Sequence, residues 1–286
     1  MDWICKTNVL IVGLGMIGGS YAAALKRLGY TVTALDTRKE AIGFALEKDM
    51  IDKGAADIDE KLIGEADAVI FALYPGAFKE WIKENQHLLK SGALLTDVTG
   101  VKACIVYDIQ EMLRQDVEFI AAHPMAGREK SGVEYSDPSV FRDANYIVTP
   151  TAKNTETAIE WCKNLGRILG FAHIAVLSPE EHDRAIGFVS QLTHTIAIAL
   201  MTCNDNQHLA EFTGDSFRDL TRIANINDVM WSELFLRNKA CLIEQMDSFI
   251  KEFETIRDLI DKEDVEELRA KMRLSTARRS AFDRKK

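Results

Sequence analysis

His123 is the residue of this chain best suited to acid–base chemistry. It follows an apolar segment, Glu118–Ala122, that is typical of a buried strand, and Pro124 and Gly127 come soon after it. We expect Pro124 to end the strand pairing and Gly127 to allow a ligand to approach closely. A histidine with a pKa near neutrality can accept the proton of a substrate hydroxyl while hydride leaves the carbon. A purely structural histidine is the alternative.

A glycine-rich turn carries the second chemical signal. Gly13, Gly15 and Gly18 form a GxGxxG pattern between the apolar segment Asn8–Val12 and a segment with helical periodicity. Glycines at these positions permit the tight strand-to-helix turn, the approach of a pyrophosphate and the close packing of helix on strand. The N–H groups at the start of the helix can bind phosphate. The pattern predicts a dinucleotide site.

An acidic residue specifies the cofactor. Asp36 ends the next predicted strand, Thr31–Leu35, where a carboxylate binds ribose hydroxyls and repels a 2′-phosphate. We therefore predict NAD rather than NADP, with Arg38 as the nearby residue that could soften the preference. An ordinary glycine turn with a loop aspartate is the alternative. The predicted cofactor-binding residues are Gly13, Gly15, Met16, Ile17, Gly18, Asp36, Tyr74 and Pro75.

Strand and helix patterns alternate along the chain until about residue 176. Helices are expected between most of the strands, beginning with one that starts near residue 17. The expected strands are 8–12, 31–35, 68–73, 93–97, 118–122, 145–149 and 172–176. This alternation predicts an α/β Rossmann-type doubly wound sheet whose ligand crevice lies at the carboxyl ends of the strands. Ser178-Pro179-Glu-Glu181 is typical of a helix start, and the rest is helical. We predict an NAD-binding domain over 1–176 and an all-α substrate-binding and dimerisation domain over 177–286.

Composition restricts the class of protein. The 286 residues are 47% hydrophobic and carry a net charge of −9, which argues against a nucleic-acid binder. The five cysteines include no CxxC pair, so we expect reduced thiols and no metal. The N-terminus shows no secretory signal, and the apolar run near 195–203 is shorter than the ~20 residues of a membrane span. We expect a cytoplasmic enzyme with no membrane partner. The apolar helix predicted over 180–202 favours a homodimer.

Motifs beyond the glycine turn resemble those of one enzyme family. The segments 123–132 (HPMAGREKSG), 97–102 (DVTGVK), 178–183 (SPEEHD), 190–194 (SQLTH) and 217–224 (FRDLTRIA) are similar to those of prephenate dehydrogenase and its arogenate-specific relatives. The resemblance covers nearly the whole chain. It implies oxidative decarboxylation of prephenate to 4-hydroxyphenylpyruvate with NAD⁺ in tyrosine biosynthesis, and a helical, dimeric second domain.

The resemblance also implies roles for individual residues. His123 matches the catalytic histidine that binds the ring hydroxyl, and His194 and Arg222 match positions that hold the side chain and ring carboxylate of the substrate. A guanidinium suits this task because it binds a carboxylate through two parallel hydrogen bonds. Ser190 lies one helical turn before His194, so both can face one cleft. The alternatives are a core histidine for His194 and a surface salt bridge for Arg222.

The chain departs from the family pattern at three positions. Gly100 replaces a serine that binds the catalytic histidine in some members, and we expect Thr99 to supply the hydroxyl instead. Gln191 replaces a histidine, and Arg128 replaces a threonine. We predict substrate contacts for Gln191 and for Arg128, with pairing to a nearby acid as the alternative for Arg128. The matched segment also includes His182, which could orient the hinge between the domains.

Three other functions remain open at this stage. An arogenate dehydrogenase would form tyrosine directly. A two-domain β-hydroxyacid dehydrogenase would use a lysine from the second domain, where this chain offers His194. A non-catalytic NAD-sensing protein would make His123 structural.

Overall fold

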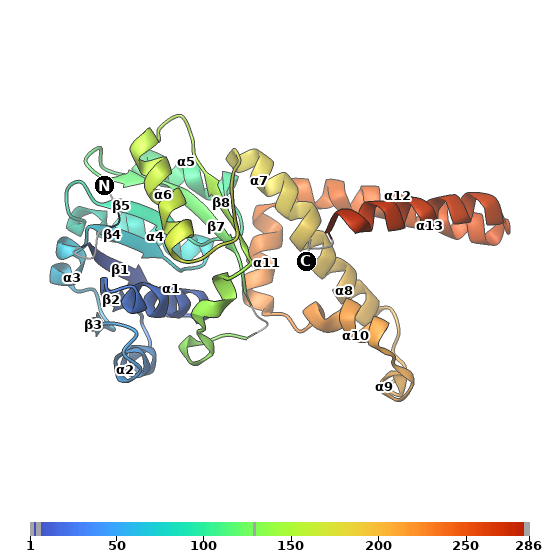
Figure 1. Ribbon diagram of the computed structural model, residues 1–286, viewed down its shortest axis with the longest axis horizontal. Coiled ribbons are helices and arrows are strands. Elements are labelled where there is room, and N and C mark those ends of the chain that lie inside the picture. The colour runs from blue at the N-terminus through green and yellow to red at the C-terminus, as the bar shows by residue number, and fades with distance from the viewer. Residues whose placement is uncertain (1–2, 4–6, 128–129, 283–286) are drawn as a thin grey trace. The chain divides into compact units, whose positions relative to one another are not determined.

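The computed structural model describes residues 3, 7–127 and 130–282. The chain forms two compact units, residues 1–238 and 239–286 (Figure 1). The first unit contains the strands and the helices up to residue 237, and the helices from residue 239 onward form the second unit. The functional boundary at residue 176 remains a prediction.

A parallel sheet forms the centre of the first unit. Its strands are β1 (Asn8–Val12), β2 (Thr31–Leu35), β3 (Lys53–Ala55), β4 (Ala68–Phe71), β5 (Leu94–Asp97) and β6 (Glu118–Phe119). They lie in the order β3-β2-β1-β4-β5-β6, and each neighbouring pair is parallel. The strand order reverses between β1 and β4. In such sheets, ligands bind outside the carboxyl ends of the strands at this point.

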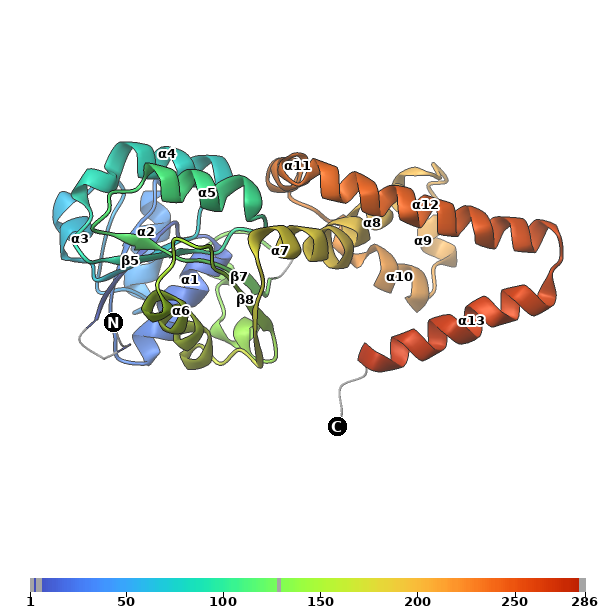
Figure 2. The same ribbon diagram turned by 90° about the horizontal axis from the view of Figure 1, so that it is seen from above.

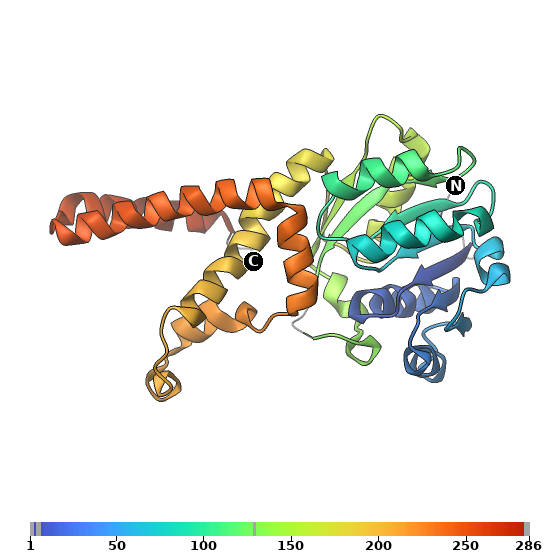
Figure 3. The same cartoon turned by 180° about the vertical axis from the view of Figure 1, so that it is seen from behind.

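Helices cover both faces of the sheet. They are α1 (Met16–Arg27), α2 (Lys39–Glu47), α3 (Glu60–Glu65), α4 (Pro75–Asn85), α5 (Ala103–Met112) and α6 (Glu156–Ile168). Helices α1 and α6 lie toward the viewer in Figure 1, and α4 and α5 lie toward the viewer in Figure 3. Short 3₁₀ helices occur at 86–88, 133–135, 138–141, 222–224 and 280–282.

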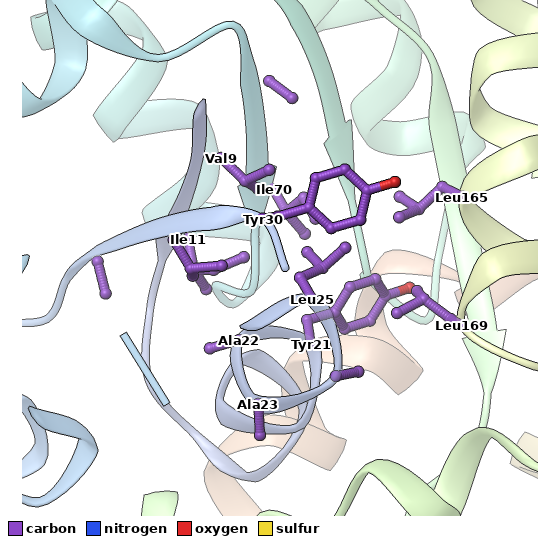
Figure 4. Packing of buried hydrophobic residues seen from close by; sticks show 14 of the residues in the cluster. Val9, Ile11, Tyr21, Ala22, Ala23, Leu25, Tyr30, Ile70, Leu165 and Leu169 are labelled. Atoms are coloured by element: carbon purple, nitrogen blue, oxygen red, sulfur yellow. The ribbon is translucent and has the colours of Figure 1, made fainter. Parts of the chain in front are cut away.

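Alternation along β1 divides the core into two clusters. Val9 and Ile11 pack toward α1 and α6, whereas Leu10 and Val12 pack toward α4 and α5. Figure 4 shows the first cluster, with Tyr21 of α1 among the residues beside β1 and α6. Each fully buried aliphatic or aromatic side chain contributes about 1.5–3 kcal/mol to folding. The buried layers hold the carboxyl ends of the strands in fixed positions.

A second, smaller sheet carries His123. It consists of β7 (Ala121–Met125), β8 (Asn145–Thr149) and β9 (His173–Val176), with β7 antiparallel to β8 and β8 parallel to β9. The sequence-based expectation that Pro124 ends the pairing is wrong, because Pro124 lies opposite Tyr146 within the ladder. An edge strand tolerates a proline because one side of its backbone needs no partner. The expected strand 118–122 is accordingly divided between β6 and β7.

A continuous helical run follows residue 178. It consists of α7 (Pro179–Ile186), a π-helix (Gly187–Leu192) and α8 (Thr193–Thr202), followed by α9 (Leu209–Phe212), α10 (Asp215–Thr221) and α11 (Asp228–Arg237). The predicted helix start is confirmed, since Ser178 and Glu181 form a reciprocal capping box with Pro179 at the first position.

The run Pro179–Thr202 is long and apolar enough, by length and composition, to cross a membrane, with a mean hydropathy of 1.4. It nevertheless carries His182, Asp183 and Gln191, which are buried and bonded to neighbouring elements. A lipid-exposed helix would leave such groups without partners. These contacts join residues 182–191 of the run to the rest of the first unit, while 28% of its apolar window is buried.

The second unit is a helical hairpin of α12 (Lys239–Asp261) and α13 (Val265–Arg279) (Figure 2). Lys271 of α13 forms an ion pair with Glu252 of α12 at 2.7 Å. Large apolar side chains remain exposed on this hairpin, among them Ile250, Phe253 and Met272. An exposed apolar face of this kind is typical of an interface with another chain.

Candidate active site

The glycine turn has the geometry of a pyrophosphate cradle. Gly13 has a φ of +98°, and a Cβ there would lie 2.5 Å from the carbonyl oxygen of Ala72. A Cβ on Gly18 would lie 1.9 Å from the carbonyl oxygen of Gly13. Around Gly15, by contrast, no described heavy atom lies within 4 Å of the position a Cβ would take. Two of the glycines are required by the packing, and the third leaves space next to the N-terminus of α1.

Asp36 lies beside this turn at the end of β2. Its Oδ2 accepts a hydrogen bond from the Leu14 backbone N–H at 2.6 Å, and its Oδ1 accepts one from Arg38 Nε at 3.1 Å. The Arg38 guanidinium also donates to the Leu14 carbonyl at 2.9 Å. The carboxylate and the first turn of α1, which begins with Met16 and Ile17, are therefore neighbours. This donor and acceptor set fits the ribose and pyrophosphate of a dinucleotide.

The loop after β4 is linked to α11. Tyr74 is 41% exposed, and its hydroxyl accepts a hydrogen bond from Asn227 Nδ2 at 3.3 Å. Pro75 opens α4, and the Gly76 N–H donates to Glu233 Oε1 at 2.8 Å. Helix α11 thus holds the loop whose first residues were predicted to contact the cofactor.

A buried ion pair holds the strand that carries His123. Lys102 Nζ donates to Asp97 Oδ2 at 2.7 Å and to the Ala122 carbonyl at 2.6 Å. Asp97 Oδ1 accepts the Ala122 N–H at 3.1 Å. Both backbone groups of Ala122 are therefore bonded to the carboxyl end of β5 or to the loop that follows it. This clamp places His123 at the same edge of the sheet as the glycine turn.

His123 belongs to a chain of hydrogen bonds that leads into α7. Its Nδ1 lies 2.9 Å from His182 Nε2, and His182 Nδ1 lies 2.8 Å from Asp183 Oδ1. Asp183 accepts the backbone N–H groups of Lys102 at 2.8 Å and Ala103 at 2.9 Å. His182 is fully buried. The sequence located His182 through the segment 178–183 but suggested only a hinge role for it.

Burial keeps His123 neutral. Burial, followed by repulsion from His182 and Lys102, lowers the pKa of His123 well below 6.5. This direction departs from the sequence-based expectation of a pKa near neutrality. A neutral imidazole is the form that can accept a proton.

The Thr99 hydroxyl bonds to groups other than His123. Its hydroxyl is hydrogen-bonded to Asp97 Oδ2, to the Val101 carbonyl at 3.0 Å and to Lys102 Nζ at 3.2 Å. A Cβ on Gly100 would lie 3.8 Å from His123 Cε1. The position that carries a serine in some resembling proteins therefore lies next to the His123 ring and Leu234, whereas the Thr99 hydroxyl belongs to the ion-pair network.

The helical side of the site contains His194. Its ring packs on Trp231 with 3.7 Å between centroids, and its Nδ1 donates to the Ser190 carbonyl at 2.8 Å. Ser190 lies in the π-helix, a form that is frequent at functional sites. Arg222 begins the 3₁₀ turn Arg222–Ala224, which packs against α8. No sequence signal indicated Trp231.

Gln191 and Arg128 were also predicted to contact the substrate. Gln191 is buried, with Nε2 donating to the Leu234 carbonyl at 3.2 Å and Oε1 accepting from Asn238 Nδ2 at 2.8 Å. Its amide therefore joins the π-helix to the end of α11. Arg128 lies outside the described residues.

Comparison with known proteins gives a consistent result. Residues 21–174 match the model "Prephenate dehydrogenase, nucleotide-binding domain", and residues 178–274 match "Prephenate dehydrogenase, dimerization domain". The chain is 34% identical to the prephenate dehydrogenase of Bacillus subtilis over 92% of this chain and 72% of that protein. It is 27% identical to the cyclohexadienyl dehydrogenase of Zymomonas mobilis over 90% and 89%. The crystal structure of prephenate dehydrogenase from A. aeolicus with hydroxyphenyl propionate and NAD⁺ superimposes with a TM-score of 0.90 at 33% identity, covering 99% and 100% of the two chains.

Proposed function

Since the chain belongs to the prephenate dehydrogenase family, we propose that it converts prephenate to 4-hydroxyphenylpyruvate with His123 as the proton acceptor. The protein is an NAD-dependent dehydrogenase whose reaction serves tyrosine biosynthesis. The observation that carries the role of His123 is the Asp97–Lys102 clamp, which holds this residue at the edge of the sheet that bears the glycine turn.

The proposed reaction oxidises the carbon C4 of prephenate, which carries the ring hydroxyl. Bound NAD⁺ supplies the hydride acceptor, held by the glycine turn, Asp36 and the loop of Tyr74 and Pro75. Neutral His123 takes the hydroxyl proton as hydride leaves C4. Loss of the ring carboxylate as CO₂ makes the ring aromatic, and the proton returns to the phenolic oxygen. The net products are 4-hydroxyphenylpyruvate, CO₂ and NADH.

The helical side of the site would hold the two carboxylates of the substrate. We assign Arg222 and His194 to these groups and Ser190 to the same cleft. Gln191 receives a structural role, because its amide atoms already bind Leu234 and Asn238. A substrate contact for Arg128 remains a prediction.

The domain roles and the assembly belong to the same proposal. Residues 1–176 would bind NAD, and residues 177–286 would bind substrate and form a homodimer in the cytoplasm. The match to the dimerization domain over 178–274 and the exposed apolar side chains of the α12–α13 hairpin support the dimer.

Cofactor choice gives one testable consequence. We expect kcat/KM to be much higher with NAD⁺ than with NADP⁺, because the Asp36 carboxylate repels a 2′-phosphate. Asp36→Ser should narrow the difference, since it removes that charge and leaves the Arg38 guanidinium to meet the phosphate. Steady-state kinetics with both cofactors measures this, and a wild-type preference for NADP⁺ would show that the role of Asp36 is misassigned.

Arg222 gives a second consequence. A guanidinium that holds the ring carboxylate stabilises the charge that leaves as CO₂, so its contribution is to positioning. We expect Arg222→Ala to weaken the binding of prephenate by about 2–4 kcal/mol, which is measured as a rise in KM. The fall in kcat should be smaller. Arg218→Ala is the matched control, because Arg218 lies one turn earlier, is exposed and pairs with Asp215. An unchanged KM in Arg222→Ala would remove this residue from the site.

Product identification tests the function itself. Purified enzyme with NAD⁺ and prephenate should give equal amounts of NADH and 4-hydroxyphenylpyruvate, with release of CO₂. Turnover of arogenate but not of prephenate would indicate an arogenate dehydrogenase. Turnover of a β-hydroxyacid instead, or of no substrate at all, would contradict the proposal.

A further inference from the structure

We infer that His182 and Asp183 are positioning residues that hold the proton of His123 on Nδ1 and so leave Nε2 unprotonated toward the substrate. This inference rests on the proposed role of His123 as proton acceptor. It assigns two buried residues of α7 a specific task in a reaction whose reacting groups lie elsewhere.

The direction of the hydrogen bonds is determined from the aspartate. Asp183 receives the backbone N–H groups of Lys102 and Ala103 at the N-terminus of α5, where the helix dipole favours an anion. An ionised carboxylate can only accept hydrogen bonds, so His182 Nδ1 must be the donor.

The hydrogen bond between His182 and His123 has its direction set by the one between Asp183 and His182. A neutral His182 that carries its proton on Nδ1 has a lone pair on Nε2. The 2.9 Å contact with His123 then requires His123 Nδ1 to donate. A neutral imidazole has one N–H, so His123 Nε2 must be the acceptor. The opposite tautomer would direct a proton at the substrate hydroxyl and could not remove one.

Burial favours the neutral form of His182, and the neighbouring charges act on its pKa in both directions. The titratable groups that face His182 are Asp183, Lys102, Asp97 and His123. Burial is the largest cause that lowers the pKa of His182, and the hydrogen bond to Asp183 opposes it. When His123 takes up the substrate proton, it still donates from Nδ1 to His182. The new positive charge is therefore connected through His182 to the carboxylate of Asp183.

The surrounding structure fixes the relay in place. Asn238 Nδ2 donates to the Asp183 carbonyl at 2.8 Å, so α7 is held at this residue from a second side. Gly100 faces the His123 ring but has no side chain to bind it.

Nitrogen NMR of ¹⁵N-histidine enzyme bound to NAD⁺ reads the tautomer directly, and the chain has only six histidines to assign. In the wild type we expect His123 to be neutral with its proton on Nδ1. His182→Phe, which keeps a ring but removes the acceptor, should shift the proton toward Nε2. It should also lower kcat by up to about 10²-fold, which is part of the contribution of a positioned general base, with little change in KM for prephenate.

Two further variants separate the relay from a merely structural role. His182→Gln can place an amide oxygen near the position of Nε2 and should restore part of both the tautomer and kcat. His173→Gln, at an exposed position on β9, should change neither. If His182→Phe fails to fold, the tautomer of His123 in the wild type and in His182→Gln still tests the relay.

A proton on Nε2 in the wild type, or a His182→Phe enzyme that keeps both tautomer and kcat, would overturn the relay. The NMR measurement needs no turnover. An enzyme that shows the Nδ1–H tautomer but fails to oxidise prephenate would therefore support the relay while refuting the proposed function.

Discussion

Replacing His123 by Asn should lower kcat for prephenate by about 10²–10⁴-fold, because the asparagine amide cannot accept the proton that leaves the C4 hydroxyl. The Kd of NAD⁺ should change little, since the predicted cofactor contacts lie between β1 and α1 and just after β2, away from β7. Pre-steady-state hydride transfer and fluorescence titration of NAD⁺ measure the two quantities. His173→Asn is the matched control. Loss of folding together with activity would instead indicate a structural histidine.

The pH dependence follows from the same residue. Because the pKa of His123 is lowered by burial, the neutral, active form predominates above that pKa and is lost as the pH falls through it. The acid limb of kcat/KM should therefore lie well below pH 6.5, and the enzyme should be insensitive to His123 ionisation at neutral pH. His123→Asn should lose this limb. A limb at or above pH 6.5 that disappears in the variant would contradict the assigned burial effect.

Lys102→Met should destabilise the protein by about 3–5 kcal/mol, because removing one member of a buried ion pair leaves the other charge uncompensated. The substitution would leave Asp97 without its cation and the Ala122 carbonyl without its donor. Urea unfolding measures the change in free energy.

Lys90→Met is the matched control, since Lys90 pairs with Asp67 near the surface. Its effect should be about 0–1 kcal/mol. Similar losses in the two variants would show that the Asp97–Lys102 pair contributes no more than a surface pair. The double variant Asp97→Asn/Lys102→Met should recover part of the stability by removing the unpaired charge.

The cofactor cradle could be predicted from the sequence because its requirements are local. Gly13, Gly15 and Gly18 follow one strand, and Asp36 ends the next, so spacing alone specifies their geometry. In the structure, a Cβ would be crowded at Gly13 and Gly18 and would have open space at Gly15.

Features that depend on tertiary contacts were harder to predict. The strand β3 spans only Lys53–Ala55 and contains a glycine, so it has little periodicity to detect. The division of 118–125 between two sheets depends on pairing with β8, which lies about 20 residues further along. Helical spacing cannot show that Gln191 turns toward Leu234, because the π-helix changes the face on which residues lie.

The partner of His123 illustrates the same limit. Sequence proximity suggested Thr99, whereas the observed contact comes from His182, 59 residues away. The motif at 178–183 marked His182 as noteworthy, but only the fold shows that α7 brings it beside β7. The role of a single histidine in a helix depends on tertiary contacts of this kind, which cannot be predicted from one sequence.

A crystal structure of the enzyme with NAD⁺ and 4-hydroxyphenylpropionate, an analogue that cannot donate hydride from C4, tests the account most directly. We predict the phenolic oxygen about 2.6–3.2 Å from His123 Nε2, the ring over the nicotinamide and the side-chain carboxylate within reach of His194 or Arg222. His182 should still contact His123 Nδ1. A ligand whose hydroxyl lies away from His123, or a nicotinamide bound far from β7, would contradict the assignment.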